Sequence, residues 1–169
     1  MIIRKETMKD YSSVEKVITQ AFLGAEHTDG NEAQLVAALR KSEAFIPELS
    51  LVAERNGEII GHILLTKAHV QQVSVLSLAP LAVLPSQQRK GVGKALVQQV
   101  LQIAKQLSYD YVVVLGGSYY RHFGFIPAST LGILPPFDVP DEYFMAKKLK
   151  SDAAELSDVM QYAVEFGIG

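Results

Sequence analysis

The spacing of apolar residues changes along the chain and predicts the order of its secondary-structure elements. An apolar start at residues 1–5 predicts a strand, and helical spacing follows at about residues 8–22 and 32–41. Residues 50–70 read as two strands joined at Asn56-Gly57, a dipeptide favoured in two-residue hairpin turns. The first part of the chain therefore predicts a strand, two helices and a hairpin.

The next part alternates between strand-like and helix-like patterns. A strand at about residues 73–84 contains Pro80, which cannot donate to a β-ladder and so predicts either an edge strand or a local distortion. A helix is expected from Gly91 to about Leu107, because one face of that segment is apolar. The run YVVVLG at residues 111–116 predicts a strand buried on both sides.

The last part continues with SYYRHFGF, which predicts a short helical turn closing on Gly124, and with a strand over residues 143–149. The tail at residues 150–169 is compatible with either a strand or a helix. This order of elements predicts an α/β (α+β) protein with a mixed sheet. At 169 residues the chain has the length of one ordinary domain, so we expect residues 1–169 to form a single domain.

Composition narrows the function. A net charge of -2 with 20% charged residues argues against a nucleic-acid binder with a broad basic face. The absence of cysteine excludes a disulfide framework, a thiolate nucleophile and a cysteine-based zinc site. His62 and His69 lack metal-ligand spacing to each other and to His27 and His122, so no metal site is expected. Without a signal-peptide core or an apolar run of ~20 residues, no membrane partner and a cytoplasmic location are expected.

The segment QQRKGVGKAL predicts an anion site at the start of a helix. The first N–H groups of a helix have no internal partner and lie at the positive end of its dipole. Gly91 and Gly93 allow a ligand to approach the backbone, and Arg89, Lys90 and Lys94 add positive charge. These features favour a ligand with several phosphate charges.

Two familiar phosphate-binding loops do not fit this segment. The only Gly-Lys pair is followed by alanine instead of serine or threonine, and the third glycine of the dinucleotide fingerprint is missing. The pattern that fits is Gln88-x-x-Gly91-x-Gly93. It resembles the R/Q-x-x-G-x-G/A signature of the GCN5-related N-acetyltransferases (GNAT), in which this loop holds the pyrophosphate of acetyl-coenzyme A.

Neighbouring segments extend the resemblance. The preceding LAVLP is similar to the fourth strand of the family, where a bulge separates two strands and frees backbone groups for the pantetheine arm. Tyr120 to Phe125 resembles the family's Y-x-x-x-G-F segment. The longer forms LAPLAVLPSQQRKGVG and YYRHFGFIPA resemble a bacterial YhbS-like subfamily. The resemblance implies a mostly antiparallel central sheet with helices on both faces and a splayed strand pair at the cofactor site.

The resemblance also implies roles for individual residues. Backbone N–H groups of Leu81, Ala82 and Val83 would orient the arm and polarise the acetyl carbonyl. The residues expected at the pyrophosphate are Gln88, Arg89, Lys90, Gly91, Val92, Gly93 and Lys94. Tyr120 is the expected general acid, since the register against Gly-Phe favours it over Tyr119. With reference pKa values of roughly 8.5 for a thiol and about 10 for tyrosine, full proton transfer is uphill by about 2 kcal/mol.

One element of the family is missing. Many members carry N-x-x-A just before the tyrosine, whereas Val113 to Gly116 fill those places here, so Gly116, Gly117 and Ser118 are candidates for replacement contacts. The general base stays open among Glu26, His27, Asp29, Glu32 and a water molecule.

The implied activity is an N-acetyltransferase (EC 2.3.1.-) that moves an acetyl group from acetyl-coenzyme A to a primary amine of a small molecule or protein. The amine would attack directly in a ternary complex without a metal. Two alternatives stay open: an acetyl-coenzyme A or coenzyme A sensor or interaction module without catalysis, and a nucleotide-binding protein. The apolar stretch from Val159 to Ile168 is a candidate homodimer contact.

Overall fold

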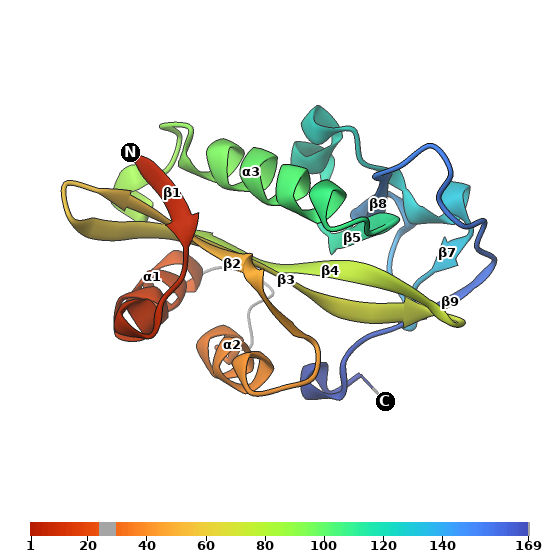
Figure 1. The fold of residues 1–169 in the computed structure, drawn as a ribbon, viewed down its shortest axis with the longest axis horizontal. Coiled ribbons are helices and arrows are strands. Elements are labelled where there is room, and N and C mark those ends of the chain that lie inside the picture. The colour runs from red at the N-terminus through yellow and green to blue at the C-terminus, as the bar shows by residue number, and fades with distance from the viewer. Residues whose placement is uncertain (24–29, 169) are drawn as a thin grey trace.

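The computed structural model describes residues 1–23 and 30–168, which form an open, twisted sheet flanked by helices (Figure 1). The main order of strands across the sheet is β1-β2-β3-β4-β5-β8-β6. The strands are β1 (Ile2–Lys5), β2 (Phe45–Arg55), β3 (Glu58–Val70), β4 (Val73–Val83), β5 (Tyr111–Leu115), β6 (Ile126–Pro127), β7 (Ile133–Leu134), β8 (Phe144–Lys148) and β9 (Asp158–Gln161). Along this order every pair is antiparallel except β4 and β5, which are parallel.

Helices cover both faces of the sheet, as the resemblance implies. Helices α1 (Tyr11–Phe22) and α2 (Glu32–Arg40) lie on one face, and α3 (Val92–Gln106) lies on the other (Figure 1). Helix α3 buries one stripe of apolar residues that includes Leu96, Val97 and Val100. It approaches β3 closely at Gly61, where an added Cβ would lie 3.0 Å from side-chain atoms of Leu96 and Val92. The position of α3 is therefore set by the core beneath it.

Strand β4 contains the irregularity that Pro80 indicates. Leu65 of β3 pairs with Leu78, and Ile63 pairs with Leu81, so Ala79 and Pro80 together lie opposite one residue of β3. This arrangement is a β-bulge. The described pairing between β4 and β5 covers residues 76–78 and 112–114 and does not continue past the bulge. Because β4 lies between β3 and β5, Pro80 marks a distortion of an inner strand, and the alternative of an edge strand is wrong.

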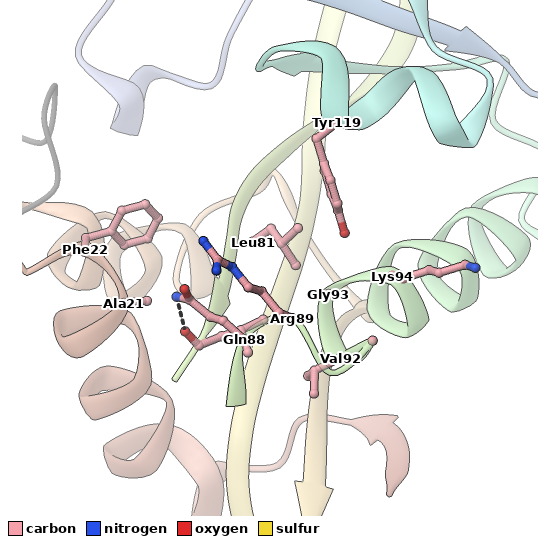
Figure 2. Close-up of a pocket in the computed structure, with 11 residues that line it drawn as sticks. Ala21, Phe22, Leu81, Gln88, Arg89, Val92, Gly93, Lys94 and Tyr119 are labelled. Carbon is pink, nitrogen blue, oxygen red and sulfur yellow. Dashed lines mark hydrogen bonds between the residues drawn. The ribbon is translucent and has the colours of Figure 1, made fainter. Parts of the chain in front are cut away.

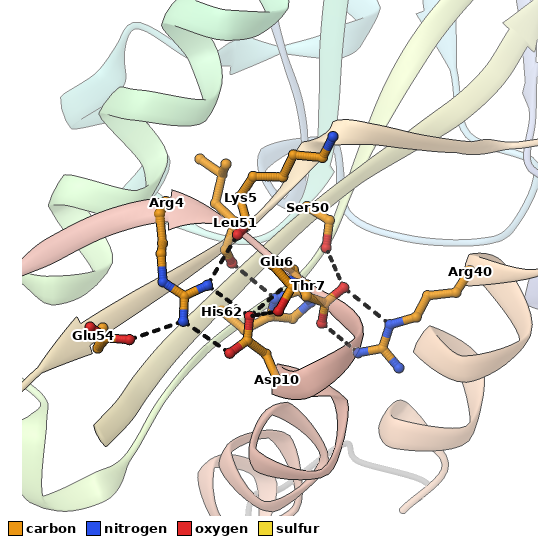
Figure 3. A network of polar contacts seen from close by, with 10 residues as sticks. All are labelled: Arg4, Lys5, Glu6, Thr7, Asp10, Arg40, Ser50, Leu51, Glu54 and His62. Carbon is orange, nitrogen blue, oxygen red and sulfur yellow. Dashed lines mark hydrogen bonds and ion pairs between the residues drawn. The ribbon is translucent and has the colours of Figure 1, made fainter. Parts of the chain in front are cut away.

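A network of ion pairs joins the first strand to the helices on the α1 and α2 face (Figure 3). Arg40 of α2 binds both oxygens of the Glu6 carboxylate at 3.1 and 2.6 Å, and Ser50 of β2 donates to the same carboxylate at 2.9 Å. Arg4 of β1 binds the Asp10 carboxylate at 2.7 and 2.9 Å. These contacts tie the start of α1 and the end of α2 to the sheet.

The predicted elements agree with the structure in type, with corrections at their ends. The hairpin turn is confirmed, with φ of 53° at Asn56 and 78° at Gly57. The first helix begins with a 3₁₀ turn at Met8–Asp10. The tail, which the sequence leaves open between a strand and a helix, contains β9, which pairs with β3 and β7, and a 3₁₀ turn at Val164–Phe166. Within the described residues, no helix has the length and apolar character needed to cross a membrane.

Candidate functional site

The loop between β4 and α3 turns sharply through two left-handed residues. Arg89 has φ of 62° and Gly91 has φ of 85°, after which α3 begins at Val92. Arginine rarely adopts positive φ, and such conformations concentrate at functional sites. The first helical hydrogen bond runs from the Ala95 N–H to the Gly91 carbonyl at 3.0 Å. The preceding N–H groups of the first turn therefore have no partner within the helix and are oriented for an anion.

A cavity of about 500 Å³ opens between the end of β4, the start of α3 and the end of α1 (Figure 2). Its lining residues are Ala21, Phe22, Leu81, Val83, Gln88, Arg89, Gly91, Val92, Gly93, Lys94 and Tyr119. The structure thus brings the predicted cofactor residues together, with two exceptions. The side chain of Ala82 is buried in the core, since neighbouring strand residues face opposite sides, and Lys90 is exposed on the loop. Both remain candidates through their backbone N–H groups.

Gln88 ties the loop to the end of β4. Its side-chain Nε2 donates to the Val83 carbonyl at 3.1 Å, a contact visible in Figure 2. This hydrogen bond holds the loop against the strand that lines the cavity. The glutamine of the Q-x-x-G-x-G pattern is therefore positioned to fix the path of the backbone.

Gly93 faces the interior of the cavity. An added Cβ at Gly93 would lie 3.1 Å from the Tyr119 hydroxyl oxygen, 3.8 Å from Val83 Cγ2 and 3.9 Å from Leu81 Cδ2. Strand β4, helix α3 and Tyr119 therefore enclose a passage that a side chain at position 93 would narrow. Tyr119 comes from the 3₁₀ turn at Ser118–Phe123 and points toward the start of α3 (Figure 2).

Tyr120, the predicted general acid, lies in a different environment from Tyr119. Its ring packs against Gly116, where an added Cβ would lie 2.5 Å from Cε2, and against Phe125 at a centroid distance of 5.7 Å. Burial raises the pKa of Tyr120 to about 12. Tyr120 is not among the described residues that line the cavity, whereas Tyr119 is. The sequence motif contains both Tyr119 and Tyr120, and the packing of the turn determines which of the two rings lines the cavity.

Two lining residues come from α1, which the motifs do not indicate. Ala21 and Phe22 form the wall opposite α3. Phe22 also lines a second cavity of about 270 Å³, together with Ile18, Thr19, Leu23, Gly30, Glu32 and Ala33. An apolar residue at the end of an amphipathic helix reads as core in a sequence, so no local signal distinguishes Phe22 from a packing residue.

The candidate general bases divide between two parts of the chain. Glu26, His27 and Asp29 lie outside the described residues. Glu32, at the start of α2, lines the second cavity, which shares Phe22 with the first. Of the replacement contacts considered for the missing N-x-x-A element, the Gly116 N–H already donates to the Tyr143 carbonyl at 2.8 Å.

The histidines show no arrangement for a metal in the part of the chain that the structure describes. His62 is fully buried, its Nδ1 lies 2.9 Å from the Leu51 carbonyl oxygen, and burial lowers its pKa to about 4. His62 is therefore a neutral core residue at pH 7. Among the described residues, no group of three or more His, Cys, Asp or Glu side chains is placed to hold a metal ion.

The sequence profile of the Acetyltransferase (GNAT) family matches residues 13–125, which include most of α1, the β4–α3 loop and the tyrosine turn. The chain belongs to the GNAT acetyltransferase family. This GNAT protein is 35% identical to the uncharacterised N-acetyltransferase YjhQ of Escherichia coli over 152 residues, which cover 86% of this chain and 81% of YjhQ. It is 28% identical to YhbS of E. coli over 98% of each chain.

Solved structures of GNAT proteins agree with this fold over almost the whole chain. The crystal structure of E. coli YhbS in complex with CoA matches with a TM-score of 0.89 and 26% identity, covering 98% of this chain and 91% of that one. A GNAT acetyltransferase from Brucella melitensis in complex with acetyl-CoA matches with a TM-score of 0.82 and 28% identity, covering 98% and 97%. The expected mixed, mostly antiparallel sheet and the YhbS-like resemblance are confirmed.

Proposed function

We propose that this protein is an N-acetyltransferase that moves an acetyl group from acetyl-CoA to a primary amine by direct attack in a ternary complex. The observation that carries the proposal is the course of β4. After the bulge at Ala79-Pro80 the strand no longer pairs with β5, and its end runs along a cavity that leads to the first turn of α3. The CoA and acetyl-CoA complexes of the two similar proteins support the same ligand here.

The cavity offers different chemistry at its two ends. At the α3 end, the N–H groups of the first turn and the charges of Arg89 and Lys94 suit the pyrophosphate of the substrate. Along β4, backbone groups of residues 81–83 suit the pantetheine arm and the acetyl carbonyl, because hydrogen-bond donors aimed at a developing oxyanion stabilise the transition state. Binding at both ends would hold the thioester in place for attack by the amine.

Tyr120 is our candidate for the proton donor to the leaving thiolate. With its pKa at about 12 and a thiol pKa of about 8.5, full proton transfer is uphill by roughly 5 kcal/mol. Burial that disfavours the tyrosinate also disfavours a thiolate, so a dry site raises the thiol pKa and narrows this difference. A late proton transfer to a desolvated sulfur is consistent with the buried tyrosine.

The second cavity is our candidate for the acceptor site. It adjoins the first across the ring of Phe22, and Glu32 lies in its wall. A carboxylate there could accept a proton from an ammonium group and leave the neutral amine that the reaction needs. A volume of about 270 Å³ suits a small amine or a single side chain of a larger substrate.

The test is acetyl-CoA-dependent turnover by the purified protein with a panel of small amines and peptides, measured by release of free thiol. We expect turnover with at least one amine, and a fall of about a hundredfold to ten-thousandfold in kcat for Tyr120→Phe with little change in CoA affinity. Full activity of Tyr120→Phe would remove Tyr120 as the proton donor. Tight CoA binding without turnover of any amine would favour the binding module, and tighter binding of ATP than of CoA would favour a nucleotide-binding protein.

A further inference from the structure

Tyr119 occupies a position that neither the loop motif nor the tyrosine motif assigns. Its hydroxyl oxygen lies 3.1 Å from the site that a Cβ on Gly93 would take, on the side where Val83 and Leu81 also approach. These three neighbours belong to β4 and to the 3₁₀ turn at Ser118–Phe123. The hydroxyl therefore reaches into the passage between β4 and α3.

The ring of Tyr119 is held in this direction by its neighbours on the turn. It packs edge-on against Tyr120 and against Phe123, each at a centroid distance of 5.3 Å. Tyr119 is 43% exposed as a residue and lines the cavity, so its ring forms part of the cavity wall and is not core. The hydroxyl end of the ring faces α3 (Figure 2).

Apart from Gln88, Arg89 and Lys94 of the loop and the first turn of α3, the other side chains that line the cavity are apolar. Leu81 and Val83 face it from β4, Val92 lies at the start of α3, and Phe22 closes the far side. A pantetheine arm carries two amides, and an amide buried without a hydrogen-bond partner costs free energy. The free backbone of β4 can pair with only one side of such an arm. A hydroxyl, which both donates and accepts, suits the other side.

Resting on the proposed acetyl-CoA site, we infer that the Tyr119 hydroxyl hydrogen-bonds an amide of the pantetheine arm across from β4, and so fills the role left open by the missing N-x-x-A asparagine. Tyr119 is thus a binding residue for the arm. Side chains of a helix project sideways, whereas its first N–H groups point along its axis. The Tyr119 hydroxyl lies where a side chain of Gly93 would project, beside β4. We therefore expect it to contact the arm and not the phosphates.

This assignment separates two ligands that share the pyrophosphate. CoA carries both the pyrophosphate and the arm, whereas ADP carries adenosine and the pyrophosphate without the arm. We expect Tyr119→Phe to raise the Kd for CoA by about threefold to tenfold, the effect of one hydrogen bond, and to leave the Kd for ADP unchanged within about twofold. Both constants are measured by calorimetric titration, with ADP taken to millimolar concentration.

The matched control is Tyr143→Phe, because Tyr143 is also an exposed tyrosine near this turn but does not line the cavity among the described residues. Its CoA affinity should equal that of the wild type. An unchanged CoA affinity in Tyr119→Phe, or an equal loss for CoA and ADP, would overturn the inference. Wild-type protein that binds CoA but acetylates no amine would instead overturn the proposed function and leave the Tyr119 comparison intact.

Discussion

Replacing Gly116 with alanine tests how Tyr120 is held. An added Cβ at Gly116 would lie 2.5 Å from Tyr120 Cε2 and 2.8 Å from Cδ2, which is closer than carbon atoms approach without displacement. Gly116 is not among the positive-φ residues, so alanine is acceptable to the backbone there. Any effect of the substitution therefore comes from the clash with the ring.

The size of the effect follows from what surrounds the ring. The Tyr120 ring packs against Phe125 at a centroid distance of 5.7 Å and against Tyr119 at 5.3 Å. The Tyr120 ring therefore cannot move without disturbing one of these two contacts. Overpacking of this kind costs about 1–3 kcal/mol. For a protein of this size, 1 kcal/mol corresponds to about 2–4 °C in Tm, so we expect Gly116→Ala to melt about 3–10 °C below the wild type.

The neighbouring Gly117 provides a matched control in the same loop. An added Cβ at Gly117 would lie 3.5 Å from the nearest atom of Tyr143, an ordinary van der Waals contact. Gly117→Ala should therefore melt within about 2 °C of the wild type. In a Tyr120→Ala background the clash disappears, and Gly116→Ala should then cause no further loss.

Thermal unfolding followed by circular dichroism decides between these outcomes. Equal melting temperatures for Gly116→Ala and Gly117→Ala would refute the packing of Tyr120 against Gly116. If Gly116→Ala still lowers the melting temperature in the Tyr120→Ala background, the added methyl group clashes with a group other than Tyr120. In the expected case, Gly116→Ala also lowers turnover more than CoA affinity, because the clash displaces Tyr120, the proposed proton donor, and not the phosphate loop.

Three further outcomes follow from the structure. Burial lowers the pKa of His62 to about 4, so between about pH 6.5 and 4 the unfolded chain binds a proton that the folded chain does not bind. As the pH falls through this range, the free energy of unfolding of the wild type, measured in urea, should decrease by up to about 3 kcal/mol. The decrease should be smaller for His62→Gln. Arg40→Met leaves the Glu6 carboxylate, 2% exposed, without its ion pair and should cost about 3–5 kcal/mol in the same assay; a cost near zero contradicts this. Gly93→Val fills the passage and should raise the Kd for CoA more than tenfold, whereas Lys94→Ala, which removes one exposed charge, should raise it by about twofold to fivefold in calorimetric titration.

Local chemistry made much of the fold predictable. The hairpin turn at Asn56-Gly57 and the start of α3 at Gly91 both require positive φ, and the residues that tolerate it stand at those positions. The spacing of apolar residues likewise predicted the ends of the helices to within a few residues. The two-residue strands β6 and β7 are too short to show a pattern, and β9 forms because the tail meets β3 and β7 in space.

The candidate site was predictable only where it is made of backbone. The loop from Gln88 to Gly93 owes its proposed role to its glycines and to the start of a helix, and both can be recognised in the sequence. The sequence does not indicate that Tyr119 and Phe22 line the cavity, because an aromatic residue in a turn or at a helix end has the same pattern whether it faces core or cavity. The direction of Tyr119 is set by the packing of its ring against Tyr120 and Phe123 within the folded turn, and the order of residues does not show this packing.

The two irregularities of the chain explain why the cavity lies where it does. The bulge at Ala79-Pro80 ends the pairing of β4 with β5, and the left-handed residues Arg89 and Gly91 turn the chain into α3. Between them, residues 81–83 stay extended beside the cavity with one side of their backbone released from β5. A binding surface built mainly from main-chain groups depends more on the path of the backbone than on charge, so substitutions that change this path should weaken CoA binding more than the loss of any single lysine.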